Sequence, residues 1–373
     1  MGKPIAEMSA DGTLTQEMAE NMEYLVRVLD DRKNIVYMNK SMRKQFGDMK
    51  GKPCHQIFFR DSKCDDCVTS RSWESGKPEV KDILSGSRYF RLMSSPIMLD
   101  ADEKYSVEML YDITEQKSLE VELMEHYGKL TAELNFARNI QRSMLPADGV
   151  YWDTFRLSSL YLPAEVLGGD LFDIIRISEN QTLLYIADVS GHGVQASMLT
   201  MFLREVVRGK LKEAAESMKS LMKSLMDGYE DLDIDPEIYL SVLLCCYDKA
   251  KQELSIVNAG HNCYPLIVRN DGAVEEIIAK GLPISKLGSF FDYNEIKTGF
   301  VPGERLVLYT DGIVEEFNKE EQKVFGAEGV KEILKEYKAL GGKDLAARIV
   351  GAAMDFSDDH PKDDRAIMVA DAI

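Results

Sequence analysis

Residues 151–373 alternate short apolar runs with helical patterns, and this alternation restricts the fold more than any other feature of the sequence. Polar links of three to five residues, at 248–252 and 270–272, join several of the apolar runs. Such a link allows a hairpin, whereas a parallel pair of strands needs a long crossover. The pattern therefore predicts antiparallel sheets and a mixed α+β domain. The predicted strands are 183–187, 239–247, 254–258, 266–269, 306–309 and 366–370, and the predicted helices are 194–212, 214–228 and 330–340.

The charge of the chain excludes several classes of partner. Its 373 residues include 45 Lys and Arg against 63 Asp and Glu, which gives a formal net charge of −18. Nonspecific nucleic-acid binding and docking on anionic lipid both need a basic surface, so we expect no nucleic acid and no membrane as partner. The longest apolar run, 240–247, is far shorter than the roughly 18 residues that span a bilayer, and the first residues lack a signal pattern. We therefore expect a cytoplasmic protein whose six cysteines do not form structural disulfides.

Aspartates at the ends of apolar strands are the candidate site. They are Asp170 in "LGGDLFDI", Asp188 in "YIADVSGHG", Asp311 in "VLYTDGIVE", and Asp363 beside Asp364 in "PKDDRAIMVA". A carboxylate on an apolar wall is costly unless it is paired or binds a metal ion. Turns explain one such aspartate but not the set, and hard cations such as Mg²⁺ and Mn²⁺ prefer oxygen ligands of this kind. His192 and His261 have no second histidine at a spacing typical of zinc sites, so we assign neither to a metal.

Seven segments follow one another in a fixed order between residues 137 and 370. They are "ARNIQRSMLP", "GGDLFDI", "ADVSGHGVQAS", "NAGHNCYPL", "GLPI", "LVLYTDGIVE" and "DDRAIMVA". In this order they resemble the PPM family of metal-dependent serine/threonine protein phosphatases, above all its bacterial stage II sporulation E-like branch, which acts in stress-response partner switching. The resemblance implies an α-β-β-α sandwich over residues 151–373, with two Mn²⁺ or Mg²⁺ ions at one edge. It also implies a substrate, a phosphoserine or phosphothreonine on an anti-sigma-factor antagonist protein.

Carried over to this sequence, the resemblance implies that Asp188 bridges the two ions. The backbone carbonyl of Val189 and the side chain of Asp170 would hold one ion, Asp170 directly or through water. Asp311 and Asp363 would hold the other. A water between two such ions loses a proton near neutral pH and attacks phosphorus in line. The chain is therefore expected to be a phosphoprotein phosphatase in which these four aspartates are catalytic.

Residues 14–114 form a smaller unit with a mixed pattern. A helical pattern over 14–29 precedes strand-like runs at 34–39, 87–94 and 105–111. The segments "DDRKNIVYMNKSMRKQFG" and "DITEQK" resemble the start and the end of a PAS sensor domain. The sequence therefore predicts a PAS-like domain that senses a signal for the phosphatase.

Three cysteines of this unit, Cys54, Cys64 and Cys67, lie in "GKPCHQIFFRDSKCDDC". A C-x-x-C pair with a third cysteine suits zinc, an iron–sulfur cluster or a redox disulfide. Cys54 and His55 would point to opposite faces of a strand, so both are not expected to be ligands. Reduced thiols in a mobile loop are the plain alternative, and the sequence leaves these interpretations open.

The sequence pattern over residues 115–146 predicts one long helix, which ends at Pro146. Its apolar positions follow a heptad repeat. The positions are Leu123, Leu130, Ala137 and Met144, with Tyr127, Leu134 and Gln141 between them. We expect this linker to pair two chains as a coiled coil, giving a homodimer whose linker carries a shift in the sensor to the site. An amphipathic helix packed on its own domain is the alternative.

Two other functions compete with the phosphatase. One is a pseudophosphatase that keeps the fold as a binding scaffold without turnover. The other is a diguanylate cyclase-like enzyme, because "GGDLF" is similar to the signature of that family, although Leu171 stands where that family needs an acidic residue. The chain also departs from the phosphatase family at Ala366, usually Thr, and at Ser285, often Gly. Neither position is a proposed ligand, so we expect these changes to tune activity and not to abolish it.

Overall fold

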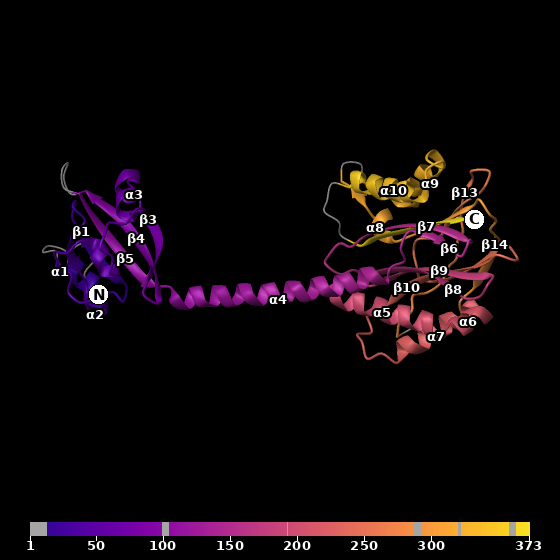
Figure 1. Ribbon diagram of the computed structural model, residues 1–373, viewed down its shortest axis with the longest axis horizontal. Helices are drawn as coiled ribbons and strands as arrows, with labels where there is room; N and C mark the ends of the chain where they lie inside the picture. Colours follow the sequence, from indigo (N-terminus) through magenta and orange to yellow (C-terminus); the bar gives the residue numbers. More distant parts are fainter. Residues whose placement is uncertain (1–12, 99–103, 192, 287–291, 320–321, 358–362) are drawn as a thin grey trace, which may run out of the picture. The chain divides into compact units, whose positions relative to one another are not determined.

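The computed structural model describes residues 13–98, 104–191, 193–286, 292–319, 322–357 and 363–373. The chain divides into two compact units, Met1–Lys129 and Leu130–Ile373. Helix α4 (Thr114–Met144) belongs to both, because the boundary falls within it (Figure 1). None of the described helices is both long enough and apolar enough to cross a lipid bilayer.

The first unit is built on a five-stranded antiparallel sheet in the order β2-β1-β5-β4-β3. Its strands are β1 (Leu25–Leu29), β2 (Ile35–Met38), β3 (Glu79–Ser85), β4 (Arg88–Met98) and β5 (Lys104–Asp112). Its helices are α1 (Thr13–Glu20), α2 (Lys40–Phe46), α3 (Val68–Ser75) and the 3₁₀ helix η2 (Cys54–Phe58). Side chains from α2, η2 and the sheet, among them Met42, Phe58 and Phe90, share one buried core. The predicted strands at 34–39, 87–94 and 105–111 correspond to β2, β4 and β5.

The predicted helix over 14–29 is wrong in its second half. Helix α1 ends at Glu20, and 25–29 form strand β1. Val26 and Val28 are β-branched and favour a strand. Arg27 is buried within this strand, where its guanidinium Nε donates to Glu108 Oε2 on β5 at 2.7 Å. Because that partner is far away in the sequence, the local pattern carries no sign of it.

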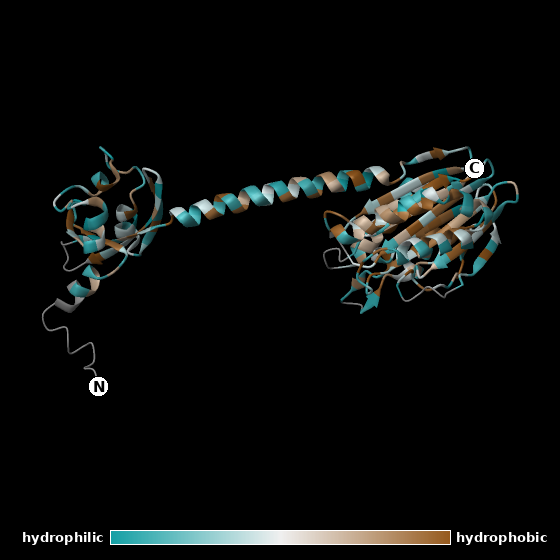
Figure 2. Ribbon diagram, turned by 90° about the horizontal axis from the view of Figure 1, so that it is seen from below, coloured by the Kyte–Doolittle hydropathy of each residue, from teal (hydrophilic) through white to brown (hydrophobic). Residues whose placement is uncertain are grey.

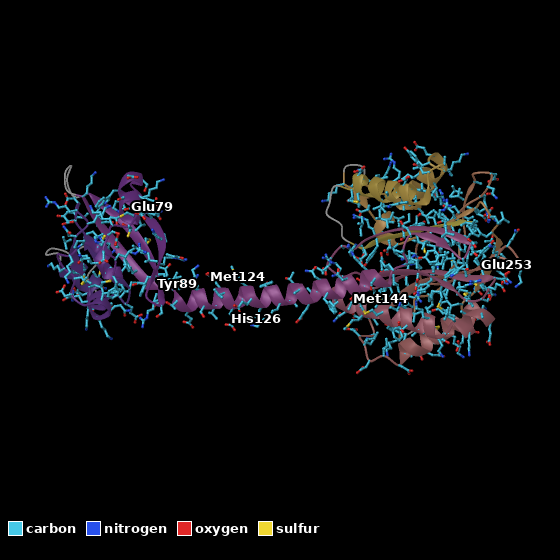
Figure 3. The ribbon with its side chains drawn as sticks, in the orientation of Figure 1. Glu79, Tyr89, Met124, His126, Met144 and Glu253 are labelled. Atoms are coloured by element: carbon cyan, nitrogen blue, oxygen red, sulfur yellow. The ribbon has the colours of Figure 1, made fainter. Side chains whose placement is uncertain are left out.

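The predicted linker helix is confirmed as α4. Leu123 and Tyr127, on the part of α4 that precedes the second unit, and Leu130, where that unit begins, are each more than half exposed. In Figure 3, Met124 and His126 point away from the helix into open space. The heptad positions from Leu123 to Leu130 therefore form an exposed apolar stripe, which is the condition for pairing with another helix, whereas Gln141 further along the pattern is buried.

The second unit contains two antiparallel sheets. One has the order β14-β11-β10-β9-β8 and the other β13-β12-β15-β18-β7-β6. The first sheet consists of β8 (Asp170–Arg176), β9 (Gln181–Val189), β10 (Leu240–Asp248), β11 (Glu253–Ala259) and β14 (Glu295–Gly299). The second consists of β6 (Gly149–Tyr151), β7 (Phe155–Leu162), β12 (Leu266–Val268), β13 (Val274–Glu276), β15 (Arg305–Tyr309) and β18 (Arg365–Ala372). A short hairpin, β16 (Phe317–Asn318) and β17 (Lys323–Val324), lies apart from both sheets.

Helices cover the outer face of each sheet, which gives the predicted α-β-β-α sandwich. Figure 1 shows α5, α6 and α7 over one face and α9 and α10 over the other. These helices are α5 (Gly193–Gly209), α6 (Leu211–Glu216), α7 (Met218–Glu230), α9 (Gly326–Glu336) and α10 (Gly342–Phe356), and α8 (Asp311–Val314) is a single turn after β15. Three buried clusters fill the layers, one between the sheets and one under each helical layer, and Figure 2 shows the strands as the most hydrophobic part of this unit. The predicted strands are present, whereas β7, β8 and α10 were not foreseen.

Candidate active site

Two of the predicted site residues face each other across neighbouring strands. Asp170 begins β8 and pairs in register with Asp188 near the end of β9. Side chains at directly opposite positions lie on the same face of the sheet, with Cβ atoms about 5 Å apart. Asp170 is buried, and Asp188 is partly exposed. The first sheet thus places two carboxylates side by side at one edge.

The second sheet brings its own carboxylates to the same place. Asp311 lies two residues after the end of β15, and Asp363 and Asp364 precede β18, the strand that pairs with β15. The hydroxyl of Thr310 donates to Asp170 Oδ2 at 2.7 Å, so it joins the two sheets at the site. The hydroxyl oxygen of Thr310 also accepts the Ala366 N–H at 2.9 Å. One threonine therefore fixes the distance between the two acidic edges.

Asp363 and Asp364 occupy different environments. Asp364 is buried, and its carboxylate accepts the backbone N–H of Ala164 at 2.7 Å and of Gly169 at 2.5 Å. Asp363 is exposed, and its Oδ1 accepts the N–H of Asp364 at 2.8 Å. Asp364 therefore holds the glycine loop before Asp170, while the Asp363 side chain stays at the surface of the site.

The glycine loop also contacts the linker helix. The side chain amide of Gln141 on α4 donates to the carbonyl of Gly168 at 2.7 Å and accepts the Gly168 N–H at 3.3 Å. Gln141 is buried, as few linker residues are. Helix α4 therefore contacts Gly168, which lies two residues before Asp170, and this contact connects the helix to the acidic site.

Burial and the charges of neighbouring carboxylates together raise the pKa values of the acidic side chains. Burial is the largest cause for both Asp170 and Asp188, and the leading charged neighbours of each are other carboxylates. Those neighbours include Asp311, Asp363 and Asp364. Burial likewise raises the pKa of Asp311 and of Asp364. So many acids at one edge repel each other unless protons or cations neutralise them.

The donor set fits hard divalent cations. The carbonyl oxygen of Val189 lies 2.8 Å from where a Cβ on Gly169 would be, so only glycine leaves room beside it. Within the described residues, no three His, Cys, Asp or Glu side chains are grouped so as to hold a single ion alone. Mg²⁺ in proteins usually keeps several waters and takes only one or two carboxylates, with phosphate oxygens completing its shell. The pairs of carboxylates and the Val189 carbonyl match that requirement.

Both ring nitrogens of His261 take part in hydrogen bonds within the fold, so neither is available to bind a metal ion. Its Nε2 lies 2.9 Å from the Tyr309 carbonyl on β15, and its Nδ1 lies 3.1 Å from the hydroxyl of Ser241 on β10. Burial lowers its pKa to about 4, so the ring is neutral at pH 7. A neutral ring can donate only from one nitrogen, so Nε2–H donates to the carbonyl and Nδ1 accepts from Ser241. His192 lies outside the described residues.

The three cysteines of the first unit line one small cavity together. Cys54 lies at the start of η2, which is not a strand, so the condition for expecting Cys54 and His55 to point to opposite faces is not met, and His55 lines the same cavity. Cys67 immediately precedes α3.

Sequence reasoning missed the contacts that Thr310, Gln141 and Asp364 make, because their partners are distant in sequence. Asp364 was identified only as the neighbour of Asp363, Gln141 only as a heptad position, and Glu315 not at all. Glu315 lies one turn after Asp311, and the charges of Asp311 and Asp363 help burial to raise its pKa. Its place in "TDGIVE" at a spacing of four from Asp311 is the one signal that could have identified it.

Comparisons with known proteins agree with this geometry. The family model for stage II sporulation protein E (SpoIIE) matches residues 178–372. The phosphoserine phosphatase RsbP of Bacillus subtilis is 26% identical over 186 residues, covering 49% of this chain and 45% of that protein. Protein IcfG of Synechocystis is 22% identical over 214 residues, covering 49% of this chain and 32% of that protein. The chain thus spans less than half the length of these curated relatives. The SiaA-PP2C domain of Pseudomonas aeruginosa has the same fold, with a TM-score of 0.56 and 22% identity over 65% of this chain and 97% of that domain.

Proposed function

Because the chain belongs to the stage II sporulation protein E (SpoIIE) family, we propose that it is a metal-dependent protein serine/threonine phosphatase. The observation that carries the proposal is the meeting of Asp170 and Asp188 with Asp311 at the edge where the two sheets join. Their leading charged neighbours are carboxylates. Such a site favours divalent cations, and cations in turn bind a phosphoryl group.

Two Mn²⁺ or Mg²⁺ ions are the proposed cofactors. Asp188 would serve both ions, Asp170 and the Val189 carbonyl would hold one of them, and Asp311 and Asp363 would hold the other. When bound, such ions activate a water and stabilise charge on the phosphoryl oxygens. The remaining work belongs to the chain itself. Thr310 orients the Asp170 carboxylate by its hydrogen bond at 2.7 Å, and burial keeps bulk water away from that side chain.

The proposed organisation has three parts. They are a PAS-like sensor over 14–114, a helical linker over 115–146 and the phosphatase domain over 151–373. The exposed apolar stripe of α4 supports pairing of two chains through the linker. The contact of Gln141 with Gly168 supports a linker that can act on the site.

The proposed substrate is a phosphoserine or phosphothreonine on an anti-sigma-factor antagonist protein. Its support is the family and the relative named phosphoserine phosphatase. Comparing catalytic efficiency on a phosphorylated antagonist and on p-nitrophenyl phosphate tests it. A dedicated protein phosphatase favours the antagonist, and equal efficiency contradicts this choice of substrate.

Replacement of the bridging carboxylate tests the catalytic proposal. Asp188→Asn should lower Mn²⁺-dependent turnover at least about 100-fold, since an ion in such a site supplies several kcal/mol of transition-state stabilisation. In chelator the variant should melt no lower than the wild type, because one of several mutually repelling carboxylates is gone. Asp271→Asn is the matched control, because Asp271 is exposed and only accepts the Ala273 N–H in a turn. Undiminished turnover in Asp188→Asn would contradict the assignment.

The same assay addresses the two competing functions. A pseudophosphatase shows no turnover of any phosphoprotein with Mn²⁺ or Mg²⁺, and a cyclase consumes GTP. The cyclase alternative has no support here, because Leu171 is buried in the core at the position where that family needs an acid.

A further inference from the structure

The cavity in the first unit gathers three thiols and several charged side chains. Cys54, Cys64 and Cys67 all line it, together with Arg27, Arg60 and Glu108. Arg27 and Glu108 form a buried ion pair and satisfy each other, with Nη2 and Oε2 2.6 Å apart. The thiols are therefore the reactive groups of this cavity, and none of them takes part in the proposed phosphatase chemistry.

The arrangement does not fit the predicted zinc ion or iron–sulfur cluster. Sites of both kinds take three or four protein ligands arranged around the metal. No group of three His, Cys, Asp or Glu side chains in the described part of the chain has such an arrangement. Instead, two thiols have separate cationic partners. The Lys33 ammonium lies 3.3 Å from Cys67 Sγ, and Arg60 Nη1 lies 3.6 Å from Cys64 Sγ.

Cys67 is the thiol whose surroundings favour the thiolate. It occupies the N-cap position of α3, and the positive end of a helix dipole favours a negative charge there. Lys33 is held in place by its bond to the Ser70 hydroxyl and by the ring of Trp73, whose centroid is 5.8 Å from the ammonium. Burial acts to raise the pKa of Cys67, but hydrogen bonds from Ser70 and Lys33 outweigh it, and the net pKa is lowered. Burial raises the pKa of Cys54 to about 11, which makes Cys54 the inert member of the three.

Cys64 is placed to react with Cys67. Two residues, Asp65 and Asp66, separate them in a bend of the chain. Cys64 and Cys67 line the same cavity, and a C-x-x-C spacing is typical of thiol pairs that close into a disulfide. Both thiols are partly exposed, so a small oxidant can reach them.

We propose that Cys67 and Cys64 form a dithiol that senses hydroperoxides by closing into a disulfide. The Cys67 thiolate attacks the outer oxygen of ROOH, the O–O bond breaks, and ROH leaves after taking up a proton. Cys67 is then a sulfenic acid. The Cys64 thiol attacks that sulfur, an S–S bond forms, and the hydroxyl leaves as water with the proton of Cys64. The two sulfurs lose two electrons, and the hydroperoxide gains them.

The disulfide would form beside the strand that leads to the linker. The Trp73 indole on α3 donates to the Tyr105 carbonyl on β5 at 3.1 Å, and the Thr69 hydroxyl donates to Glu108 on the same strand at 2.5 Å. Strand β5 ends at Asp112, whose carboxylate accepts the N–H of Thr114 at the start of α4. Oxidation also removes the acceptor that Lys33 holds at Cys67.

Alkylation of the reduced full-length chain tests the role of Lys33. Mass spectrometry after timed iodoacetamide treatment should show Cys67 reacting faster than Cys64 and Cys54. Lys33→Gln should slow Cys67 several-fold, because the neighbouring cation is lost. Lys44→Gln, an exposed lysine on α2, is the control and should leave the rate unchanged. Equal Cys67 rates in the wild type and in Lys33→Gln would overturn the proposal.

Treatment with one equivalent of hydrogen peroxide tests the disulfide itself. The peptide that contains Cys64 and Cys67 should lose two hydrogens, and dithiothreitol should restore them. In Cys64→Ser, Cys67 should stop at a sulfenic acid that dimedone traps, and Cys67→Ser should form neither product. Peroxide that leaves both thiols free, or one zinc per chain that the cysteine variants lose, would refute the proposal. These results do not depend on phosphatase turnover, so they are separable from the fate of the proposed function.

Discussion

Gly312, in the "TDG" segment of the site, offers the sharpest test of how the acidic edges are held together. Its Cα lies against the backbone of the other acidic segment. A Cβ added there would be 2.0 Å from the carbonyl oxygen of Asp364, where ordinary van der Waals contact begins at 3.4 Å. The φ of Gly312 is not positive, so alanine there is not strained by its own backbone. Gly312→Ala therefore perturbs only the distance between Asp311 and the Asp363–Asp364 segment.

The size of the effect follows from that distance. The two backbones must separate by more than 1 Å to restore contact at 3.4 Å from 2.0 Å. Overpacking of this kind costs about 1–3 kcal/mol of folding free energy. A misplacement of about 1 Å in a catalytic group costs about 100-fold in rate. The Gly312→Ala variant should therefore still be folded at low temperature, but its melting temperature should be several degrees below that of the wild type. Its turnover should be about 100-fold lower.

Gly351 provides the matched control. It lies inside α10, and a Cβ there meets no atom within 4 Å. Alanine is favoured over glycine in a helix by about 1 kcal/mol, so Gly351→Ala should melt higher with unchanged turnover. Both variants would be measured by thermal unfolding and by Mn²⁺-dependent release of phosphate. Turnover of Gly312→Ala within twofold of the wild type would refute the assignment of Asp311 and the Asp363–Asp364 segment to one site.

Three further outcomes follow from the linker and the core. Gln141→Ala removes both hydrogen bonds to the glycine loop, each worth about 1 kcal/mol, and should lower turnover about tenfold, whereas Gln116→Ala on the exposed part of α4 should not. The double variant Leu130→Glu/Leu134→Glu should dimerise more weakly, as measured by light scattering, and its turnover should change. If the variant is still a dimer with the kinetics of the wild type, the linker acts only as a spacer. Because the folded pKa of His261 is about 4, below its unfolded value of about 6.5, its contribution to stability is full above pH 6.5. That contribution is lost as pH falls towards 4, by up to about 3 kcal/mol, and denaturant unfolding of His261→Gln at pH 7 and pH 4.5 should show a weaker pH dependence.

The location of the acidic site could be predicted from sequence because it depends on where individual apolar strands begin and end. Asp170, Asp188 and Asp311 each lie at or beside the end of an apolar run, and antiparallel strands bring such ends to shared edges. Strands β9, β10 and β15 are also dense in apolar side chains, so their positions were clear from the pattern alone. Local rules are sufficient wherever a residue's environment is set by its own strand.

The residues that were missed depend on partners far away in the chain. Arg27 interrupts what reads as a helix face, and its burial in a strand is tolerable because it pairs with Glu108 on β5 and donates to the Cys54 carbonyl. Asp364 looks equivalent to Asp363 in "DDR", yet it is the buried member because Ala164 and Gly169 donate to it. No periodicity records such pairs, so the sequence alone could not separate them.

A further long-range pair lies beside the acidic segments. Arg365, next to Asp364, is buried against Glu316, with its Nε 2.8 Å from Glu316 Oε1. This pair connects the segment after Asp311 to the start of β18, independently of the Thr310 bridge. Removing one partner of a buried ion pair typically costs about 3–5 kcal/mol, far more than a surface pair does. Arg365 is thus a buried cation behind the acidic edge, where it holds the backbone, and the facing carboxylates are left to be neutralised by ions from solution.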